Sequence, residues 1–188
     1  MYAEIKLLIV PLGEVEPNLP AQLADSLTQI GLEASVGKPL PLPGAAWTRH
    51  RRQHHSGKVL TVLANPAGTP PGSRPVILGV TNADLFTPGL NFVFGVADPK
   101  ERVAVISLAR LGGRTGASGR ESLLPERALK EAVHELGHVF GLAHCGNPAC
   151  IMHFSNSVMD TDRKGPGFCL DCLASLSSSG SGFARAAQ

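Results

Sequence analysis

The stretch from residue 134 to residue 144 constrains this chain most, because it places three histidines around a glycine. On a helix, His134 and His138 lie one turn apart on the same face, where two imidazole nitrogens can meet one Zn²⁺ ion. A catalytic zinc needs a third protein ligand, but His144 lies roughly 240° further round an uninterrupted helix. The helix must therefore end first, and Gly141 is the residue best able to adopt the left-handed conformation that ends it.

Glu135 directly follows the first of these histidines, so its carboxylate can reach a water molecule at the open fourth position of the metal. Zinc lowers the pKa of such a water to about 7, and a nearby carboxylate can take its proton as it attacks a carbonyl. A chance H-E-x-x-H pattern on a solvated helix is the alternative, and the added Gly141 and His144 argue against it. The pattern predicts a catalytic zinc held by His134, His138 and His144, with Glu135 as general base.

The cysteines form a second candidate metal site. All four lie late in the chain, as a C-x₄-C pair and a C-x₂-C pair: Cys145, Cys150, Cys169 and Cys172. This two-plus-two spacing is typical of a closed structural zinc site, whereas disulfide bonds would be the interpretation in a secreted chain. The apolar run at residues 7–10 is too short for a signal peptide or a membrane span, so we expect a reduced, cytoplasmic compartment and a structural zinc.

The zinc signature resembles that of the metzincin metallopeptidases, and the residues after it narrow the likeness to the archaemetzincins. In that family the metzincin helix is followed by a four-cysteine segment, as it is here with Met152 between the two cysteine pairs. Sixteen residues separate Met152 from Cys169, one fewer than in the family pattern, which affects one loop and not the ligands. Further segments similar to the family are residues 52–53, 79–85, 92–95 and 107–111.

The resemblance implies an α+β, metzincin-like zincin fold with a twisted mixed β-sheet, a long active-site helix and a C-terminal zinc-bound cysteine segment. It implies two Zn²⁺ ions per chain and a zinc metallopeptidase that acts on peptide or protein substrates. It also implies an edge strand above the cleft, within residues 103–111, and a methionine beneath the catalytic zinc, which Met152 matches. A gap-filling role in the core is equally compatible with Met152, and Met159 is the weaker alternative.

We expect one catalytic domain over residues 1–174, with residues 145–172 as its structural zinc segment, and a disordered tail over residues 175–188. Hydrophobic periodicity predicts a helix over residues 17–30 and a longer helix that begins near Pro125 and carries the histidines. No regular element is expected over residues 37–47. The predicted strands are residues 4–10, 32–36, 76–80, 90–97 and 103–109.

Charge gives little support to other functions. The formal net charge is +2 without a long basic run, so we expect neither a nucleic-acid nor a membrane partner, and we expect a monomer. Residues 48–55 hold three histidines, His50, His54 and His55, which suit an auxiliary metal or anion site. A solvated basic segment that begins a helix running toward residue 63 is favoured, because no acidic or cysteine partner is nearby. Asp84 fits an Asx turn better than an orienting role.

Two other functions remain compatible with the motifs. One is a non-catalytic interaction module in which both zinc ions serve folding, and the other is hydrolysis of a non-peptide amide. Glu135 argues against the first, because a purely structural zinc site closes its fourth position with a protein ligand and has no use for a carboxylate beside an open one. A zinc-dependent peptidase is therefore the leading hypothesis.

Overall fold

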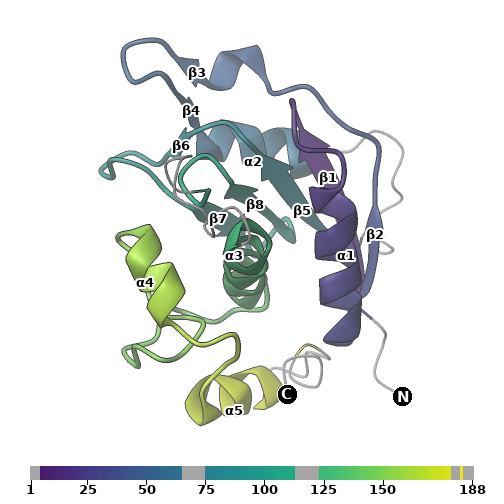
Figure 1. The fold of residues 1–188 in the computed structure, drawn as a ribbon, viewed down its shortest axis with the longest axis vertical. Coiled ribbons are helices and arrows are strands. Elements are labelled where there is room, and N and C mark those ends of the chain that lie inside the picture. Colours follow the sequence, from purple (N-terminus) through teal and green to yellow (C-terminus); the bar gives the residue numbers. More distant parts are fainter. Residues whose placement is uncertain (1–4, 65–74, 113–122, 179–182, 184–188) are drawn as a thin grey trace.

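A mixed β-sheet forms the centre of the molecule in a computed structural model that describes residues 5–64, 75–112, 123–178 and 183 (Figure 1). Its strands are, in spatial order, β2 (Glu33–Val36), β1 (Lys6–Leu12), β5 (Val76–Thr81), β8 (Val103–Ser107) and β7 (Gly95–Asp98). The first four are parallel to one another, whereas β7 is antiparallel to β8. The mixed sheet and the helices around it confirm the predicted α+β class.

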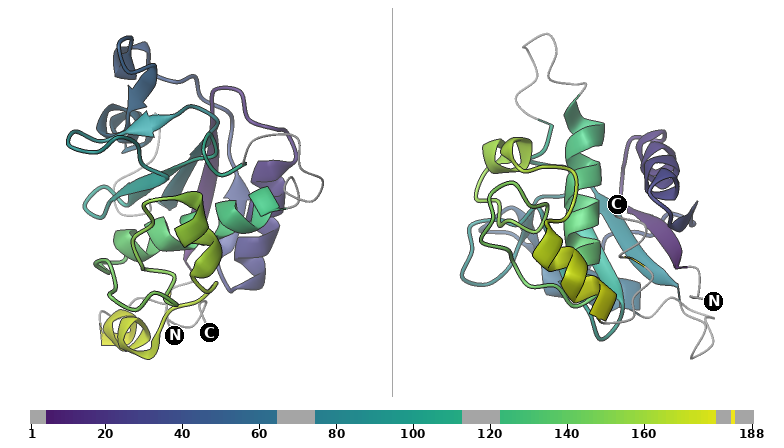
Figure 2. Two further views of the ribbon diagram at one scale, coloured as in Figure 1. Left: turned by 60° about the vertical axis from the view of Figure 1, so that its left-hand side comes forward. Right: turned by 90° about the horizontal axis from the view of Figure 1, so that it is seen from below.

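Helices cover both faces of this sheet. They are α1 (Leu19–Gln29), α2 (Ser56–Ala64), α3 (Leu124–Val139), α4 (Val158–Arg163) and α5 (Leu170–Ser178). Figures 1 and 2 show α1 and α3 on one face and α2 on the other, with α4 and α5 on the side of α3 away from the sheet. Among the described helices, none is long and apolar enough to cross a membrane.

The sheet divides the buried core in two because successive side chains of a strand point to opposite faces. In β5, Leu78 and Val80 pack with α1 and α3, whereas Ile77 packs with α2. Every residue of β5 and of β8 is buried, as expected for strands covered on both faces. Helix α3 adds Val133 and Leu136 to the larger core and begins next to Pro125, as predicted. The histidine helix is therefore fixed by the core along one side.

The predicted edge strand was wrong in its position. Strand β8 pairs with β5 on one side and with β7 on the other, so residues 103–107 are interior and β7 forms the edge. The strand predicted at residues 90–97 is regular only from Gly95 to Asp98. Apolar content could not separate these two strands, because the burial that distinguishes them depends on the neighbours they acquire in the fold.

The histidine-rich segment also differs from its prediction. Instead of beginning a helix, residues 49–52 form a turn with Arg52 at a φ of 55°, and α2 begins only after it, at Ser56. The turn lies within a second, small sheet of three short strands, and a 3₁₀ turn at residues 44–46 precedes it. These strands are, in spatial order, β3 (Trp47–Thr48), β4 (Gln53–His55) and β6 (Leu85–Phe86).

The C-terminal region is more ordered than expected. Residues 175–178, predicted to start a disordered tail, form the last turn of α5, and Leu176 is fully buried there. Phe183 is also buried, and its ring stacks on that of Phe140 at a centroid distance of 4.6 Å. Leu176 and Phe183 are isolated apolar residues in a Ser- and Gly-rich stretch, so they gave no periodic signal in the sequence. Both belong to the larger core, which also contains residues of α3. The remainder of the predicted tail lies outside the described residues.

Ion pairs hold α4 against α3. Arg127 donates two hydrogen bonds to Asp162, from Nε at 2.6 Å and from Nη2 at 2.7 Å. Nearby, the ammonium of Lys164 lies 3.0 Å from Glu131 Oε1, which also accepts a hydrogen bond of 2.8 Å from Thr161. Lys164 is fully buried and the side chain of Glu131 is 3% exposed, so this pair is shielded from solvent. Breaking such a pair leaves an uncompensated buried charge, which makes the junction of α3 and α4 rigid.

A polar network joins the small sheet to residues 90–91. Asp84 accepts two hydrogen bonds from Arg110, of 2.9 and 2.6 Å, and one of 3.1 Å from the Gln53 amide. Gln53 and Arg51 in turn donate to the backbone carbonyls of residues 90–91, at 2.9 to 3.0 Å. Asp84 therefore has the orienting role that its sequence context made the less favoured alternative.

We predict that Asp84→Ala destabilises the fold by about 1–3 kcal/mol, because the buried Gln53 amide and the Arg110 guanidinium lose their shared acceptor. Urea denaturation measures this loss, and hydrogen exchange of residues 87–94 measures the loosening of the segment held by the network. Asp25→Ala, at an exposed position of α1, is the matched control. Equal stability and equal exchange in the two variants would contradict the role given to Asp84.

Candidate metal centre and cleft

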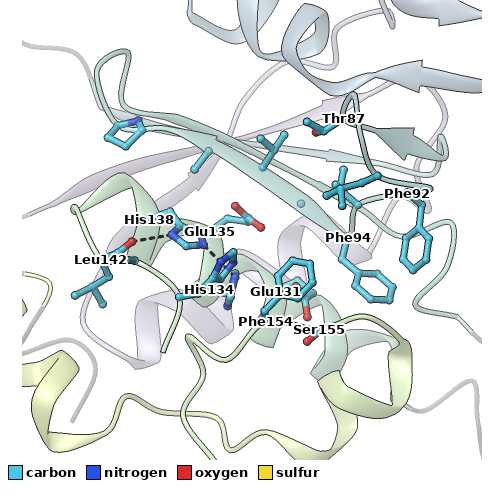
Figure 3. Close-up of a pocket in the computed structure, with 18 of the residues that line it drawn as sticks. Thr87, Phe92, Phe94, Glu131, His134, Glu135, His138, Leu142, Phe154 and Ser155 are labelled. Atoms are coloured by element: carbon cyan, nitrogen blue, oxygen red, sulfur yellow. Dashed lines mark hydrogen bonds between the residues drawn. The ribbon is translucent and has the colours of Figure 1, made fainter. Parts of the chain in front are cut away.

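A cavity of about 470 Å³ lies between the edge strand β7 and helix α3 (Figure 3). Residues 87–99 form its upper wall and include three of the four residues of β7, Gly95, Val96 and Ala97. Helix α3 forms its floor with His134, Glu135 and His138. Residues 141–144 and 154–155 complete the lining. The cavity therefore contains the predicted catalytic residues beneath the edge strand β7, which α3 contacts.

The two helical histidines have fixed orientations. Nδ1 of His134 lies 2.8 Å from the carbonyl oxygen of Ile151, and Nδ1 of His138 lies 2.7 Å from that of Leu142. Each Nδ1–H donates to a carbonyl, which leaves the lone pair of each Nε2 free to bind a metal. The two Nε2 atoms are 3.1 Å apart, close to the separation of two ligands of one ion. Both rings are thus oriented as ligands by backbone atoms.

Helix α3 ends as the sequence predicted. Gly141 has a φ of 93°, its N–H donates to the His138 carbonyl at 3.0 Å, and the next N–H, of Leu142, donates to the Gly137 carbonyl at 2.9 Å. This is the Schellman arrangement, in which a left-handed glycine reverses the chain. The reversal brings the ring of His144 to 5.3 and 4.7 Å from the centroids of the two helical histidine rings. One nitrogen from each of the three histidines lies within 4.8 Å of the others.

Burial keeps the three imidazoles neutral. It is the main reason why the pKa of His134 is lowered to about 3, and the nearby charge of Lys164 contributes to this lowering. Burial is also the main reason why the pKa values of His138 and His144 are lowered, although His144 is the most exposed of the three. Neutral imidazole is the form that binds a metal, so the site is ready for a cation at neutral pH.

Glu135 lies beneath the edge strand, against Gly95. A Cβ atom on Gly95 would lie 2.5 Å from both Cγ and Oε1 of Glu135, so only glycine leaves room for the carboxylate. Burial raises the pKa of Glu135 well above its usual value, the charge of Glu131 raises it further, and Lys164 opposes both. Oε2 is buried without a hydrogen-bond partner among the described residues. An acceptor placed in this way suits a water molecule polarised by a metal on the three histidines.

Met152 packs directly against the histidine helix. It is fully buried, and a Cβ atom on Gly137 would clash with its sulfur and lie 3.1 Å from its Cε. The missing side chain at Gly137 therefore allows the thioether to lie under the turn that links His134 to His138. Met159 is 57% exposed, so it is not the packed methionine.

The four cysteines form the second group. Their Sγ atoms lie within 4.8 Å of one another, with separations of 3.7 Å for Cys145 and Cys169 and 3.8 Å for Cys150 and Cys172. A disulfide would need about 2.05 Å, whereas four thiolates about 2.3 Å from a tetrahedral zinc lie about 3.8 Å apart. A hydrogen bond from the Cys172 N–H lowers the pKa of Cys169 to about 7, which favours a thiolate there. Zinc thus fits this group, and disulfides do not.

The two groups are mechanically joined. Cys145 follows His144 in the chain, and its N–H donates to the Met152 carbonyl at 2.9 Å. Its own carbonyl lies 3.0 Å from Nδ1 of His153. The His134 ring is held by the Ile151 carbonyl, one residue before Met152. The loop between Cys145 and Cys172 therefore supplies the carbonyl that holds His134, and it begins directly after His144. His153 belongs to neither group of possible metal ligands in the described part of the chain.

The other histidines have structural surroundings. His54 stacks on Trp47 at 4.9 Å, and His55 packs edge-on against Phe86 at 5.3 Å. Neither they nor His50 join a metal-binding group among the residues described. Sequence reasoning also missed Glu131 and Gly95, which line the cavity, and Lys164, which pairs with Glu131. Glu131 gave a weak signal, as an acid one turn before Glu135, whereas Lys164 and Gly95 gave none because their partners are distant in the chain.

Comparisons with known proteins agree with this arrangement. The sequence profile described as peptidase family M54 matches residues 75–178. The archaemetzincin of Pyrococcus abyssi is 45% identical over 179 residues, which cover 90% of this chain and 93% of that protein. The archaemetzincin of Methanocaldococcus jannaschii is 36% identical over 181 residues, covering 96% of this chain and 97% of that protein.

Solved structures give the same result for the fold. The crystal structure of archaemetzincin from Methanopyrus kandleri matches with a TM-score of 0.79 and 36% identity, over 94% of this chain and 95% of that one. Archaemetzincin from Archaeoglobus fulgidus, crystallised as a complex with malonate, matches with a TM-score of 0.74 and 40% identity, over 92% and 99%. Profile, sequence and structure agree, and the chain belongs to the archaemetzincins, peptidase family M54.

Proposed function

We propose that this protein is a zinc-dependent metallopeptidase in which His134, His138 and His144 hold the catalytic zinc and Glu135 is the general base. The supporting observation is the convergence of three neutral imidazoles and a buried, unpaired carboxylate oxygen in one cavity. We assign Cys145, Cys150, Cys169 and Cys172 to a structural zinc that fixes the chain after His144. A monomeric state and a cytoplasmic location stay predictions from the sequence.

Strand β7 is the proposed site for the substrate backbone. It pairs with β8 along one edge, and it borders the cavity. An extended peptide can add to such an edge through main-chain hydrogen bonds, which bind many sequences in the same register. Because Gly95 lies directly over Glu135, a peptide paired along β7 has its backbone close to the base. The proposed binding strand and the proposed base are therefore in contact at Gly95.

Proton transfer is the proposed role of Glu135. Zinc bound to the histidines would polarise the substrate carbonyl and lower the pKa of water. Glu135 Oε2 accepts a proton from the attacking water and then donates it to the nitrogen of the leaving amine. Its raised pKa suits this shuttle, because a carboxylate with a pKa nearer neutrality both takes and returns a proton more readily. The carbonyls that hold His134 and His138 would keep both rings oriented as ligands of the zinc.

We predict that Glu135→Gln lowers kcat/KM on an unbiased peptide library by about 10²- to 10⁴-fold, since the amide cannot accept the proton. Mass spectrometry of the library measures cleavage, and elemental analysis should still find two zinc ions per chain. Glu126→Gln, at an exposed position of the same helix, is the control that should keep its activity. Full activity in Glu135→Gln would rule out Glu135 as the general base. Cleavage of simple amides but of no peptide would show that the proposed substrate class is wrong.

We predict that Cys169→Ser loosens residues 145–172 and also weakens zinc binding by the histidines, because the cysteine loop carries their supporting contacts. Limited proteolysis should cut within this segment, and the zinc content should fall below one ion per chain after dialysis. Ala174→Ser, an exposed position on α5, controls for the added hydroxyl. The coupling is refuted by a variant that keeps its zinc content and its protease resistance.

We predict that Gly137→Ala weakens binding of the catalytic zinc, because the new methyl group displaces Met152 from beneath the histidines. Overpacking of this kind costs about 1–3 kcal/mol of stability, which thermal unfolding can measure. Competition with a zinc chelator measures affinity directly. Gly44→Ala, where an added Cβ meets nothing within 4 Å, is the control. Equal chelator resistance in both variants is the contradicting result.

A further inference from the structure

One end of the cavity differs chemically from the rest. In Figure 3 Phe92, Phe94, Phe154 and Ser155 lie on one side of His134, and Leu142 lies on the other. The rings of Phe92 and Phe94 meet edge to face at 5.1 Å, and the ring of Phe154 packs on His144 at 4.9 Å. We call this region the aromatic end, formed by Phe92, Phe94, Phe154, Ser155 and Glu131. Its walls suit a flat apolar group.

The aromatic end also holds hydrogen-bond acceptors. Ser155 Oγ is buried without a hydrogen-bond partner among the described residues. Glu131 lines the cavity, and the hydrogen bond from Thr161 and the contact with Lys164 both reach its Oε1. The other carboxylate oxygen, Oε2, is a further acceptor on the same side chain. Buried polar groups are normally paired, so Ser155 Oγ marks a place for a hydrogen-bonding ligand group, beside the Glu131 carboxylate.

The charge at this end is already balanced. The fully buried Lys164 lies 3.0 Å from Glu131, so the two form a neutral pair within the wall. A lysine or arginine side chain entering beside Lys164 would add a second buried cation without a free anion to match it. An acidic side chain would meet the Glu131 carboxylate. A neutral hydrogen-bond donor meets neither penalty and can reach Ser155 Oγ or Glu131 Oε2.

We propose that the aromatic end binds a substrate side chain that combines an aromatic ring with a neutral donor, a tyrosine or a tryptophan, beside the bond to be cut. The inference rests on the proposed peptidase function for its location. The ring fills the space between Phe94 and Phe154, and the phenol O–H or indole N–H reaches the acceptors at this end. Aromatic pairs add to the apolar area that such a ring buries, which makes the ring the main source of affinity.

The test uses a peptide series that differs at one position, with tyrosine, tryptophan, phenylalanine, leucine, lysine or aspartate beside the scissile bond. The zinc-loaded wild-type protein should show kcat/KM for tyrosine and tryptophan about 2- to 10-fold above phenylalanine, the effect of one net hydrogen bond. Lysine and aspartate should be the poorest. Equal values for tyrosine and phenylalanine, or a preference for lysine, overturn the proposal.

One variant tests the contribution of the Ser155 hydroxyl alone. Ser155→Ala should lower the ratio of tyrosine to phenylalanine kcat/KM toward one, because it removes one of the two acceptors. Ser175→Ala, whose exposed hydroxyl donates to the Asp171 carbonyl on α5, is the matched control and should keep the wild-type ratio. A ratio that is unchanged in Ser155→Ala and matches the control excludes Ser155 from the subsite and overturns this assignment.

Binding separates this inference from the catalytic one. Calorimetric titration of the zinc-loaded Glu135→Gln protein with the tyrosine and phenylalanine peptides measures affinity without turnover. Tighter binding of the tyrosine peptide supports the aromatic end even if no peptide is cleaved by the wild type, a result that would count against the proposed function alone. Equal affinities, with cleavage intact in the wild type, would overturn the subsite and leave the peptidase assignment standing.

Discussion

The reversal of the chain at Gly141 is the constraint on which the rest of the site depends. A helix can supply two ligands at a spacing of four residues, but it cannot supply the third at a spacing of six. The left-handed glycine satisfies the last carbonyls of α3 and redirects the backbone, so that His144 meets the helical pair. Cys145 comes next and enters the cysteine group. One backbone torsion therefore determines the position of both metal sites.

Around this reversal, the lower half of the cleft is held by ion pairs between α3 and residues 162–164, of which the Lys164–Glu131 pair is shielded from solvent. Arg127 donates two short hydrogen bonds to Asp162, and Lys164 forms an ion pair with Glu131 in the wall of the cavity. The proposed site, with a metal, a base and a substrate in register, would gain from such contacts, because small displacements reduce catalysis strongly. The pair also affects the electrostatics of the pocket, since the ammonium of Lys164 balances the charge of the Glu131 carboxylate.

Sequence reasoning succeeded where the determining interactions are local. The spacing of His134 and His138, the breaker at Gly141 and the paired cysteines all act over a few residues, and the structure brings each group together as predicted. It failed where burial is decided by distant partners. The resemblance implied an edge strand within residues 103–111, and the apolar run there could not show that β7 would pair outside it. The burial of Lys164 has no local signal either, because its partner Glu131 lies on α3.

Gly95 shows how the edge strand and the active-site helix are adapted to each other. A glycine weakens a strand, because it has no side chain to pack and more backbone entropy to lose. At this position glycine is required all the same, because any Cβ atom would overlap the side chain of Glu135. The carboxylate can then remain buried directly under the strand edge, where its pKa is raised and a paired peptide would pass. The cost in strand stability is offset by β8, which is buried along its whole length and holds β7 in register.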